Sequence, residues 1–285
     1  IRRALVVAQF AISIMLIVGT GVVYQQIEFL LNKDLGYDAD QMVIVPVFEI
    51  DAGVAFEEER LTDRYEAVKQ AFLGHPNVLE ATAYRWWLGW GSGLSRTVHV
   101  EGHEGTDWRM GILEVDDDYI DVFRIEMLQG RKFDLDTFPT DTSGVFVLNE
   151  AAVKTLGWDD LESSGPLGKE FKWVDRDISG RVIGVVKDFH FSSLRDPVGP
   201  VALTIHTNQF YCLGMRIKSE GVEETVAHFE TLWKQFAAGS GGSVPFFHQF
   251  FDQQFEDIYF QERRVQKLTL YSSFIAILLA CMGLF

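Results

Sequence analysis

The sequence predicts an α+β domain that lies between two membrane helices. An uncharged apolar run stands near each end of the chain, and the long stretch between these runs carries two β-α-β patterns. Two such units, separated in sequence, are typical of a split ferredoxin-like domain that carries an insertion. We therefore expect a split ferredoxin-like domain with an inserted small mixed α/β domain, flanked by transmembrane and stalk helices.

The first uncharged run covers residues 4–27. A helix rises about 1.5 Å per residue, so roughly 20 apolar residues cross the hydrocarbon layer of about 30 Å. Arg2 and Arg3 precede the run and favour a cytoplasmic N-terminus. A cleavable signal peptide is the competing interpretation, but its apolar core is usually about 7–15 residues long and ends in a small-x-small site. We therefore predict a transmembrane helix at residues 1–27.

The second uncharged run covers residues 268–285, and we assign residues 265–285 to the start of a second transmembrane helix. Apolar residues at helical spacing extend both runs toward the middle of the chain, which predicts stalk helices at residues 28–36 and 248–264. The side chains expected to transmit motion along the stalks are Ile27, Leu30, Leu31, Phe251, Phe255 and Ile258. The alternative is that each apolar stripe simply packs on the domain.

Each β-α-β pattern combines strand-like runs with an amphipathic helix. The first pattern covers residues 41–47, 56–72 and 78–84, and the second covers residues 211–217, 222–236 and 245–247. The predicted domain therefore has a first half at residues 37–94 and a second half at residues 208–247. The insert, residues 95–207, shows short strands and helices separated by Gly and Pro turns.

The domain is strongly acidic. Residues 36–260 contain 38 Asp and Glu but 19 Lys and Arg, a net charge of −19, whereas the whole chain has −16. Nucleic acid is a poor partner for such a surface, because its binding depends on Lys and Arg that neutralise phosphates. Cys281 lies in the second uncharged run and Cys212 stands alone in the domain, so no disulfide framework is predicted. The GxxxxGKS/T motif of ATP-binding loops is missing, so no ATP site is expected in this chain.

Two clusters offer potential metal ligands. His99, Glu101 and His103 alternate along a predicted strand, and imidazole and carboxylate groups are zinc ligands. Strand spacing alone does not fix the ligand geometry, and an exposed strand face is the commoner explanation.

The second cluster, Asp116 to Asp118, lacks the Gly and the terminal Glu of a calcium-binding loop. We interpret Asp116 or Asp117 as the N-cap of a helix at residues 119–123. We therefore assign no metal site to the chain.

The stretch Lys187 to His190 contains groups capable of acid–base chemistry, but no nucleophile accompanies them. We expect Asp188 to accept hydrogen bonds from backbone amides of the following turn. No catalytic or cofactor-binding residue is assigned.

An aromatic, glycine-rich loop contains Trp86, Trp87 and Trp90. A single Trp is usually buried in a core, but three in a glycine-rich loop are harder to bury. Exposed aromatic residues mark interaction surfaces, so we predict a partner contact here.

Several motifs resemble those of MacB/FtsX-like ABC transporter permeases, in the same order. The N-terminal RRALVVAQFAISIMLIVGTGVVYQQ, followed by NKDLGYD, resembles the first membrane helix and stalk of that family. Further similar stretches are LQGRKF at residues 128–133, VLNEAAVKTLGW at 147–158, PLGKEF at 166–171, VIGVVKDFHFSSL at 182–194 and ACMGLF at 280–285. Each motif is weak alone, and their order carries the resemblance.

The resemblance implies a permease subunit with a porter-like domain (37–94 and 208–247) and an inserted sabre-like domain (95–207). Residues 36–260 would be periplasmic, and the chain would be a multi-pass protein of the cytoplasmic membrane, in contact with lipid. The implied partners are an ABC ATP-binding subunit, which would hold ATP and Mg, a second permease copy or paralogue, and a periplasmic or outer-membrane protein. Family members transmit ATP-driven motion to the periplasm in efflux or envelope processes, so the chain itself would not be an enzyme.

A second class of protein has the same helix–domain–helix order. The alternative function is the extracytoplasmic ligand-sensing domain of a two-helix membrane receptor. Further hydrophobic spans beyond Phe285 would favour the permease, and a charged cytoplasmic coiled coil would favour the receptor.

Overall fold

The computed structural model describes residues 2–31, 35–38, 40–46, 65–85, 95–103, 105–159, 165–192, 196–205, 210–238 and 245–251, together with residues 268, 270–272, 274–275 and 278. The chain divides into two compact units. One combines Ile1–Asp34 with Gln254–Phe285, and the other is Leu35–Gln253.

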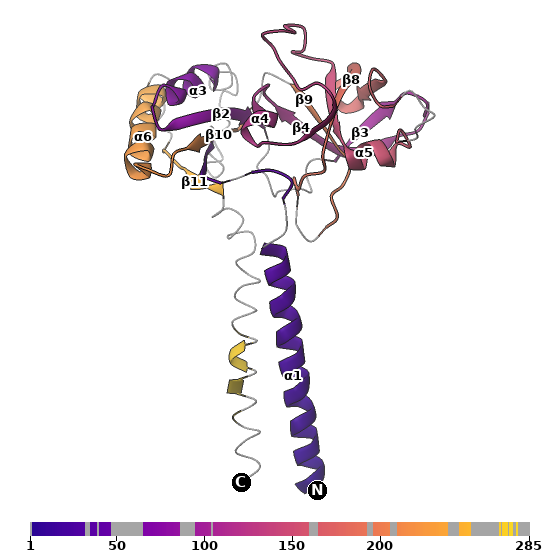
Figure 1. Cartoon of the computed structure of the whole chain (residues 1–285), viewed down its shortest axis with the longest axis vertical. Coiled ribbons are helices and arrows are strands. Elements are labelled where there is room, and N and C mark those ends of the chain that lie inside the picture. The colour runs from indigo at the N-terminus through magenta and orange to yellow at the C-terminus, as the bar shows by residue number, and fades with distance from the viewer. Residues whose placement is uncertain are drawn as a thin grey trace. The chain divides into compact units, whose positions relative to one another are not determined.

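The first unit contains the helix α1, Arg2–Leu31, drawn in indigo in Figure 1. Apolar side chains are exposed along α1, among them Ile14, Met15 and Ile17 at 59%, 73% and 46%. Over the residues that the structure describes, no helix is both long enough and apolar enough to cross a membrane.

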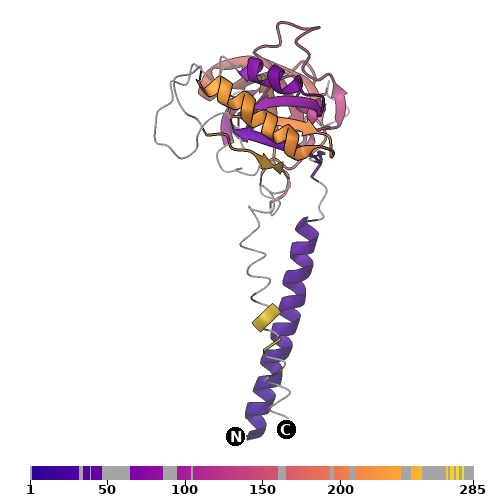
Figure 2. The same ribbon diagram turned by 90° about the vertical axis from the view of Figure 1, so that its left-hand side faces the viewer.

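The second unit begins with a small antiparallel sheet. Its strands are β1 (Met42–Pro46), β2 (Val78–Tyr84), β10 (Cys212–Ile217) and β11 (Gln249–Phe250). Their order is β11-β1-β10-β2, and each neighbouring pair is antiparallel. The helices α3 (Tyr65–Leu73) and α6 (Val222–Ala238) cover one face of this sheet (Figure 2).

The side chains under α3 and α6 form the first hydrophobic core. Alternate strand residues such as Val43, Val45 and Leu213 face the helices, as the two-residue period of a strand requires. Phe72 of α3 packs on Phe229 of α6 with ring centroids 4.7 Å apart. This core fixes the two helices on the sheet.

A second set of strands closes on itself. Its members are β3 (Ser95–Val100), β4 (Trp108–Val115), β6 (Val145–Asn149), β7 (Glu170–Trp173), β8 (Ile178–Val186) and β9 (Val201–Ile205). Within the described part of the chain, each of these strands pairs with two others of the same set, and parallel pairing of β4 with β9 completes a ring in the order β4-β3-β7-β8-β6-β9. We call this ring the barrel. Its core includes Phe146, Phe171 and Trp173.

Short elements complete the barrel. The strand β5 (Met127–Gly130) pairs with β8, and a 3-10 turn, η2 (Val174–Arg176), joins β7 to β8. The helix α5 (Glu150–Thr155) packs on the barrel core, whereas α4 (Tyr119–Val122) contacts β2.

The barrel and the small sheet belong to one β-sheet that contains both parallel and antiparallel strand pairs. They are joined where Tyr84 of β2 pairs with Val115 of β4. The structure therefore places the insert in the same compact unit as the two halves that flank it. The boundaries predicted at residues 94/95 and 207/208 adjoin stretches outside the described residues and stay predictions.

The second stalk was predicted to begin at residue 248, and the structure corrects this start. Gln249 and Phe250 form β11 and pair with Ile44 and Val43 of β1. The Phe residues are spaced three and four apart, which is typical of a helix. Residues 249–250 nevertheless form a strand, because their main chain pairs with the edge of β1. The domain thus extends at least to Phe251, which is buried.

Candidate functional site

Residues 35–38, the neck, connect α1 in sequence to the domain, and three parts of the domain bind them. The His190 amide, in the segment after β8, donates to the Leu35 carbonyl oxygen (2.8 Å). The Asp38 amide donates to the Phe123 carbonyl oxygen beside α4 (2.9 Å). Arg216 of β10 donates to the Asp38 carbonyl oxygen (2.7 Å). The neck therefore bridges the barrel, α4 and the small sheet.

Gly36 lets the neck approach the barrel segment closely. Its φ is +76°, a conformation that L side chains rarely adopt, and a Cβ atom there would overlap the Asp188 carbonyl oxygen and lie 2.8 Å from the Phe189 Cα. From the sequence, Gly36 is expected only to end the stalk helix predicted at residues 28–36. The structure adds that only glycine fits against residues 188–189.

Arg216 is the buried cation of the site. Its guanidinium also donates to the carbonyl oxygens of Asp40 and Val122, each at 2.7 Å. A buried charge is costly unless other groups compensate it, and these carbonyl oxygens, with the carboxylates of Asp38 and Glu80 each at 3.4 Å, do so for most of the guanidinium. Arg216 thus fixes the neck and α4 to β10.

The neck carboxylate is held in its charged form. Burial opposes ionisation of Asp38, but the hydrogen bond from the Asp40 amide and the charges of Arg216 and Arg124 together lower the pKa of Asp38. Arg124 contacts the second oxygen at 2.7 Å.

An aromatic cluster joins the two ends of the domain. It lies on the sheet face opposite α3 and α6. Tyr37 of the neck packs edge-on against Phe123 (5.8 Å between centroids) and against Phe251 (5.7 Å). Phe251 was predicted to lie on the apolar stripe of the second stalk, and the structure places it in this cluster of the domain, 1% exposed. The start and the end of the domain therefore share one packed contact.

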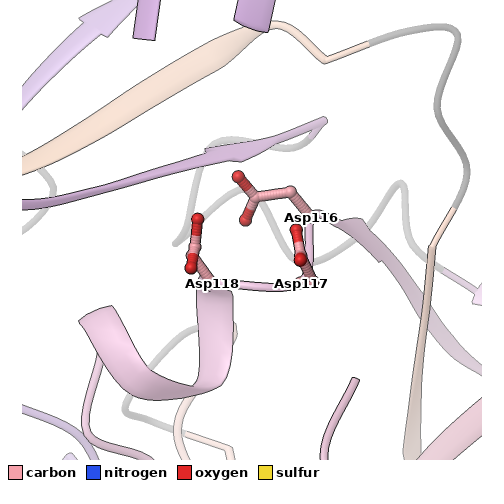
Figure 3. Close-up of side chains that lie close together, drawn as sticks. All are labelled: Asp116, Asp117 and Asp118. Carbon is pink, nitrogen blue, oxygen red and sulfur yellow. The ribbon is translucent and has the colours of Figure 1, made fainter. Parts of the chain in front are cut away.

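A buried ion pair lies at the turn between β4 and α4, the helix that precedes Phe123 of the cluster. Asp116 to Asp118 lie together at the turn that begins α4 (Figure 3). The Lys69 ammonium of α3 donates to Asp116 and to Asp118, each at 2.6 Å. The Asp116 carboxylate also accepts hydrogen bonds from the Thr82 hydroxyl and, at 2.8 Å, from the Ala83 amide.

The lysine occupies the position that a cation would need between these carboxylates. Burial disfavours the ammonium form, but attraction to Asp116 and hydrogen bonds to Asp116 and Asp118 outweigh it and raise the pKa of Lys69. The predicted capping role is wrong in detail, because the N-cap is Asp118 and its side chain makes no capping hydrogen bond. Asp116 serves as the counter-ion of Lys69.

The side chains of the other potential metal cluster, His99, Glu101 and His103, have separate partners. His99 Nε2 lies 2.7 Å from Asp107, whereas His103 Nε2 lies 3.0 Å from the Leu156 carbonyl oxygen. Glu101 accepts from the Glu170 amide. The three side chains therefore do not share one metal position.

Asp188 makes backbone contacts, but not with its own turn. It accepts from the Ala151 amide and from the Asn149 side chain, at 2.9 and 2.8 Å, at the start of α5. The segment that holds the neck is thereby fixed to the barrel.

The remaining predicted site residues lie outside the described side chains. The backbone of Ile27, Leu30 and Leu31 belongs to α1, but their side chains are not described. The residues Phe255, Ile258, Trp86, Trp87 and Trp90 lie outside the described residues altogether. Their roles stay predictions.

Sequence reasoning missed Arg216 and Lys69. Arg216 stands in the strand CLGMRI, where every residue is buried, and a lone charge in such a strand signals a satisfied ionic site. The partners of both residues are distant in sequence, so no local pattern could identify them.

Comparison with known protein families identifies the family to which this chain is related. The profile of the MacB-like periplasmic core domain matches residues 4–225. The chain belongs to this family. No curated protein sequence matches the chain.

Two solved structures have a fold similar to that of this chain. The periplasmic region of MacB from Actinobacillus actinomycetemcomitans is 18% identical, with a TM-score of 0.51 over 80% of this chain and 97% of that one. The extracellular domain of the noncanonic ABC-type transporter YknZ from Gram-positive bacteria is 14% identical, with a TM-score of 0.50 over 73% of this chain and 99% of that one. Both likenesses concern the mixed α/β fold.

The substitution Gly36→Ala should destabilise the domain by about 3 kcal/mol, because a left-handed Ala costs roughly 1–2 kcal/mol and the steric overlap adds roughly 1–3 kcal/mol. Gly157→Ala is the matched control, since Gly157 has a φ of +65° but open space around its Cβ position. Urea unfolding of the detergent-purified chain measures both. Equal losses would show that the neck does not press on residues 188–189.

The substitution Lys69→Met should cost about 3–5 kcal/mol near pH 7.5, because it leaves the Asp116 carboxylate buried without its cation. Burial already raises the pKa of Asp116 to about 6, and loss of Lys69 raises it further. In the folded variant Asp116 therefore takes up its proton at a higher pH than in the folded parent chain, so the loss should shrink as the pH falls from 7.5 toward 6 and change little below that.

Urea unfolding at several pH values measures this dependence. Lys234→Met removes an exposed pair with Glu230 and should change stability by about 0.5 kcal/mol or less at every pH. A loss at residue 69 that stays constant from pH 7.5 to 4.5 would contradict the counter-ion role of Asp116.

Proposed function

We propose that this chain is a permease subunit of an ABC transporter of the MacB/FtsX type. It couples ATP binding and hydrolysis in a cytoplasmic partner to motion of residues 36–260 outside the cytoplasm. The observation that carries the proposal is the neck, where three parts of the domain bind the segment that follows α1. The ATP and Mg belong to the ATP-binding subunit, and this chain performs no catalysis.

The proposal requires that residues 4–27 lie in the membrane. This assignment uses every residue of the uncharged run, including those whose side chains are not described. Exposed Ile14, Met15 and Ile17 support it, because successive helical residues point about 100° apart and lipid would cover them on several sides. Residues 265–285 would begin the second span of a multi-pass protein.

We propose that the neck transmits motion of α1 to both parts of the domain. Its hydrogen bond with His190 acts on the barrel, and its bonds with Arg216 act on the small sheet. Tyr37 contacts Phe251, so motion of the segment that follows Phe251 reaches the same cluster. Leu30, Leu31, Phe255 and Ile258 would carry the motion along the stalks.

The finer architecture belongs to the same proposal. We interpret β1-α3-β2 and β10-α6-β11 as the halves of a split ferredoxin-like, porter-type domain, because their four strands alternate in an antiparallel order. The barrel would then be the inserted, sabre-like part. The partners would be a second permease copy or paralogue, the ATP-binding subunit, and a periplasmic or outer-membrane protein for efflux or envelope processes.

The test uses the chain assembled with its ATP-binding subunit in lipid nanodiscs. A spin label on Glu224→Cys, exposed on α6, reports the distance between the domains of two permease copies. ATP with vanadate should shift this distance. The double substitution Leu30→Asp and Leu31→Asp should remove the shift but leave ATP hydrolysis intact, because it breaks the apolar stalk stripe.

Leu79→Asp is the matched control, since Leu79 is 50% exposed on β2 and should leave the shift unchanged. An ATP-dependent shift that survives both stalk substitutions would refute mechanical coupling through α1. Absence of any ATP-dependent shift in the parent complex would refute the transporter proposal itself.

A further inference from the structure

The loop between β5 and β6, residues 131–144, projects beyond the strands that it joins (Figure 1). Residues 136–140 at its tip are all exposed, and Phe138 presents 39% of its surface to solvent. A partly exposed aromatic side chain at the tip of a loop leaves apolar surface available for contact.

Side-chain contacts hold this tip in one conformation. The Arg131 guanidinium forms a two-pronged ion pair with Asp141, with Nη2 to Oδ1 at 3.0 Å, and its carbon lies 3.9 Å from the centre of the Phe138 ring. Asp141 is only 3% exposed. The Arg131 guanidinium therefore stacks on the Phe138 ring and is held in place by its ion pair with the buried Asp141 carboxylate.

Main-chain hydrogen bonds order the same tip. The Phe138 amide donates to the Asp134 carbonyl oxygen (2.8 Å), and the Asp141 amide donates to the Phe138 carbonyl oxygen (2.9 Å). The Asp134 carboxylate accepts from the Thr137 amide (2.8 Å). Phe133, 1% exposed, anchors the base of the loop in the domain.

The base of the loop is equally constrained. Gly144 and Gly180 meet so closely that a Cβ atom on Gly180 would overlap the Gly144 carbonyl oxygen. The Arg131 amide donates to the Ile183 carbonyl oxygen (3.0 Å), and the Arg181 amide donates to the Gly144 carbonyl oxygen (3.0 Å). Both ends of the loop are thus bound to β8.

We propose that Phe138 and Pro139 form a preorganised contact for a separate protein with an apolar pocket bordered by basic side chains. An aromatic side chain stacked on arginine is a common energetic centre of protein interfaces, and a rigid loop loses little entropy on binding. This inference does not depend on coupling through the neck.

Charge decides the kind of partner. The loop carries Asp134 and Asp136 near Phe138, while Arg131 and Lys132 are paired with Asp141 and Asp121. Residues 36–260 have a net charge of −19, so an anionic lipid surface would be repelled, and a second copy would offer this loop the same acidic domain surface, which is not complementary to its carboxylates. A basic border around the pocket is complementary to the carboxylates of Asp134 and Asp136.

The test places the photo-crosslinker p-benzoylphenylalanine at position 138 of the full chain in its native membrane. Illumination should join it to one protein other than this chain, identified by mass spectrometry. With that protein purified, Asp134→Lys combined with Asp136→Lys should weaken binding about tenfold, and Arg131→Gln should weaken it by a similar factor because Phe138 loses its support.

Two controls separate docking from chance contact. The crosslinker at Phe247, 54% exposed, should not capture the same protein. Arg181→Gln removes another exposed arginine, 65% exposed, and should leave binding unchanged. Thermal unfolding confirms that each variant folds. No adduct, adducts only with lipid or a second copy, or binding that ignores the charge reversal would overturn the proposal.

Discussion

The structure depends on one buried guanidinium. Arg216 lies in a strand whose neighbours are all buried, so its charge must be satisfied by groups that the fold brings to it. Those groups are carbonyl oxygens of Asp38, Asp40 and Val122, which come from the neck, the turn before β1 and α4. The requirement to satisfy one cation therefore fixes three segments that are far apart in sequence.

The other features of the domain follow from this arrangement. Once the neck lies beside α4, Tyr37 can pack on Phe123 and Phe251, and Gly36 can approach Asp188 and Phe189. The barrel and the small sheet are joined where β2 meets β4, and the neck supplies a further connection between them. The contacts of the neck on both sides of that junction are the observation on which the proposed coupling rests.

Prediction from sequence succeeded where the signal was local. A strand-like run located β2 with its observed bounds, and Gly and Pro turns separated the strands of the insert. It failed where pairing decides the outcome: Gln249 and Phe250 carry a helical spacing but pair with β1. Lys69 and Asp116 could not be matched, because 47 residues separate them and only the fold brings them together.

The most direct measurement of the central claim is hydrogen exchange of the Asp38 and His190 amides in the whole chain. If the neck is bound on both sides, these amides should exchange as slowly as amides in β10, because both require opening of the domain. If the neck is only a linker, the two amides should exchange on the timescale of exposed loops while β10 stays protected. That result would contradict the account.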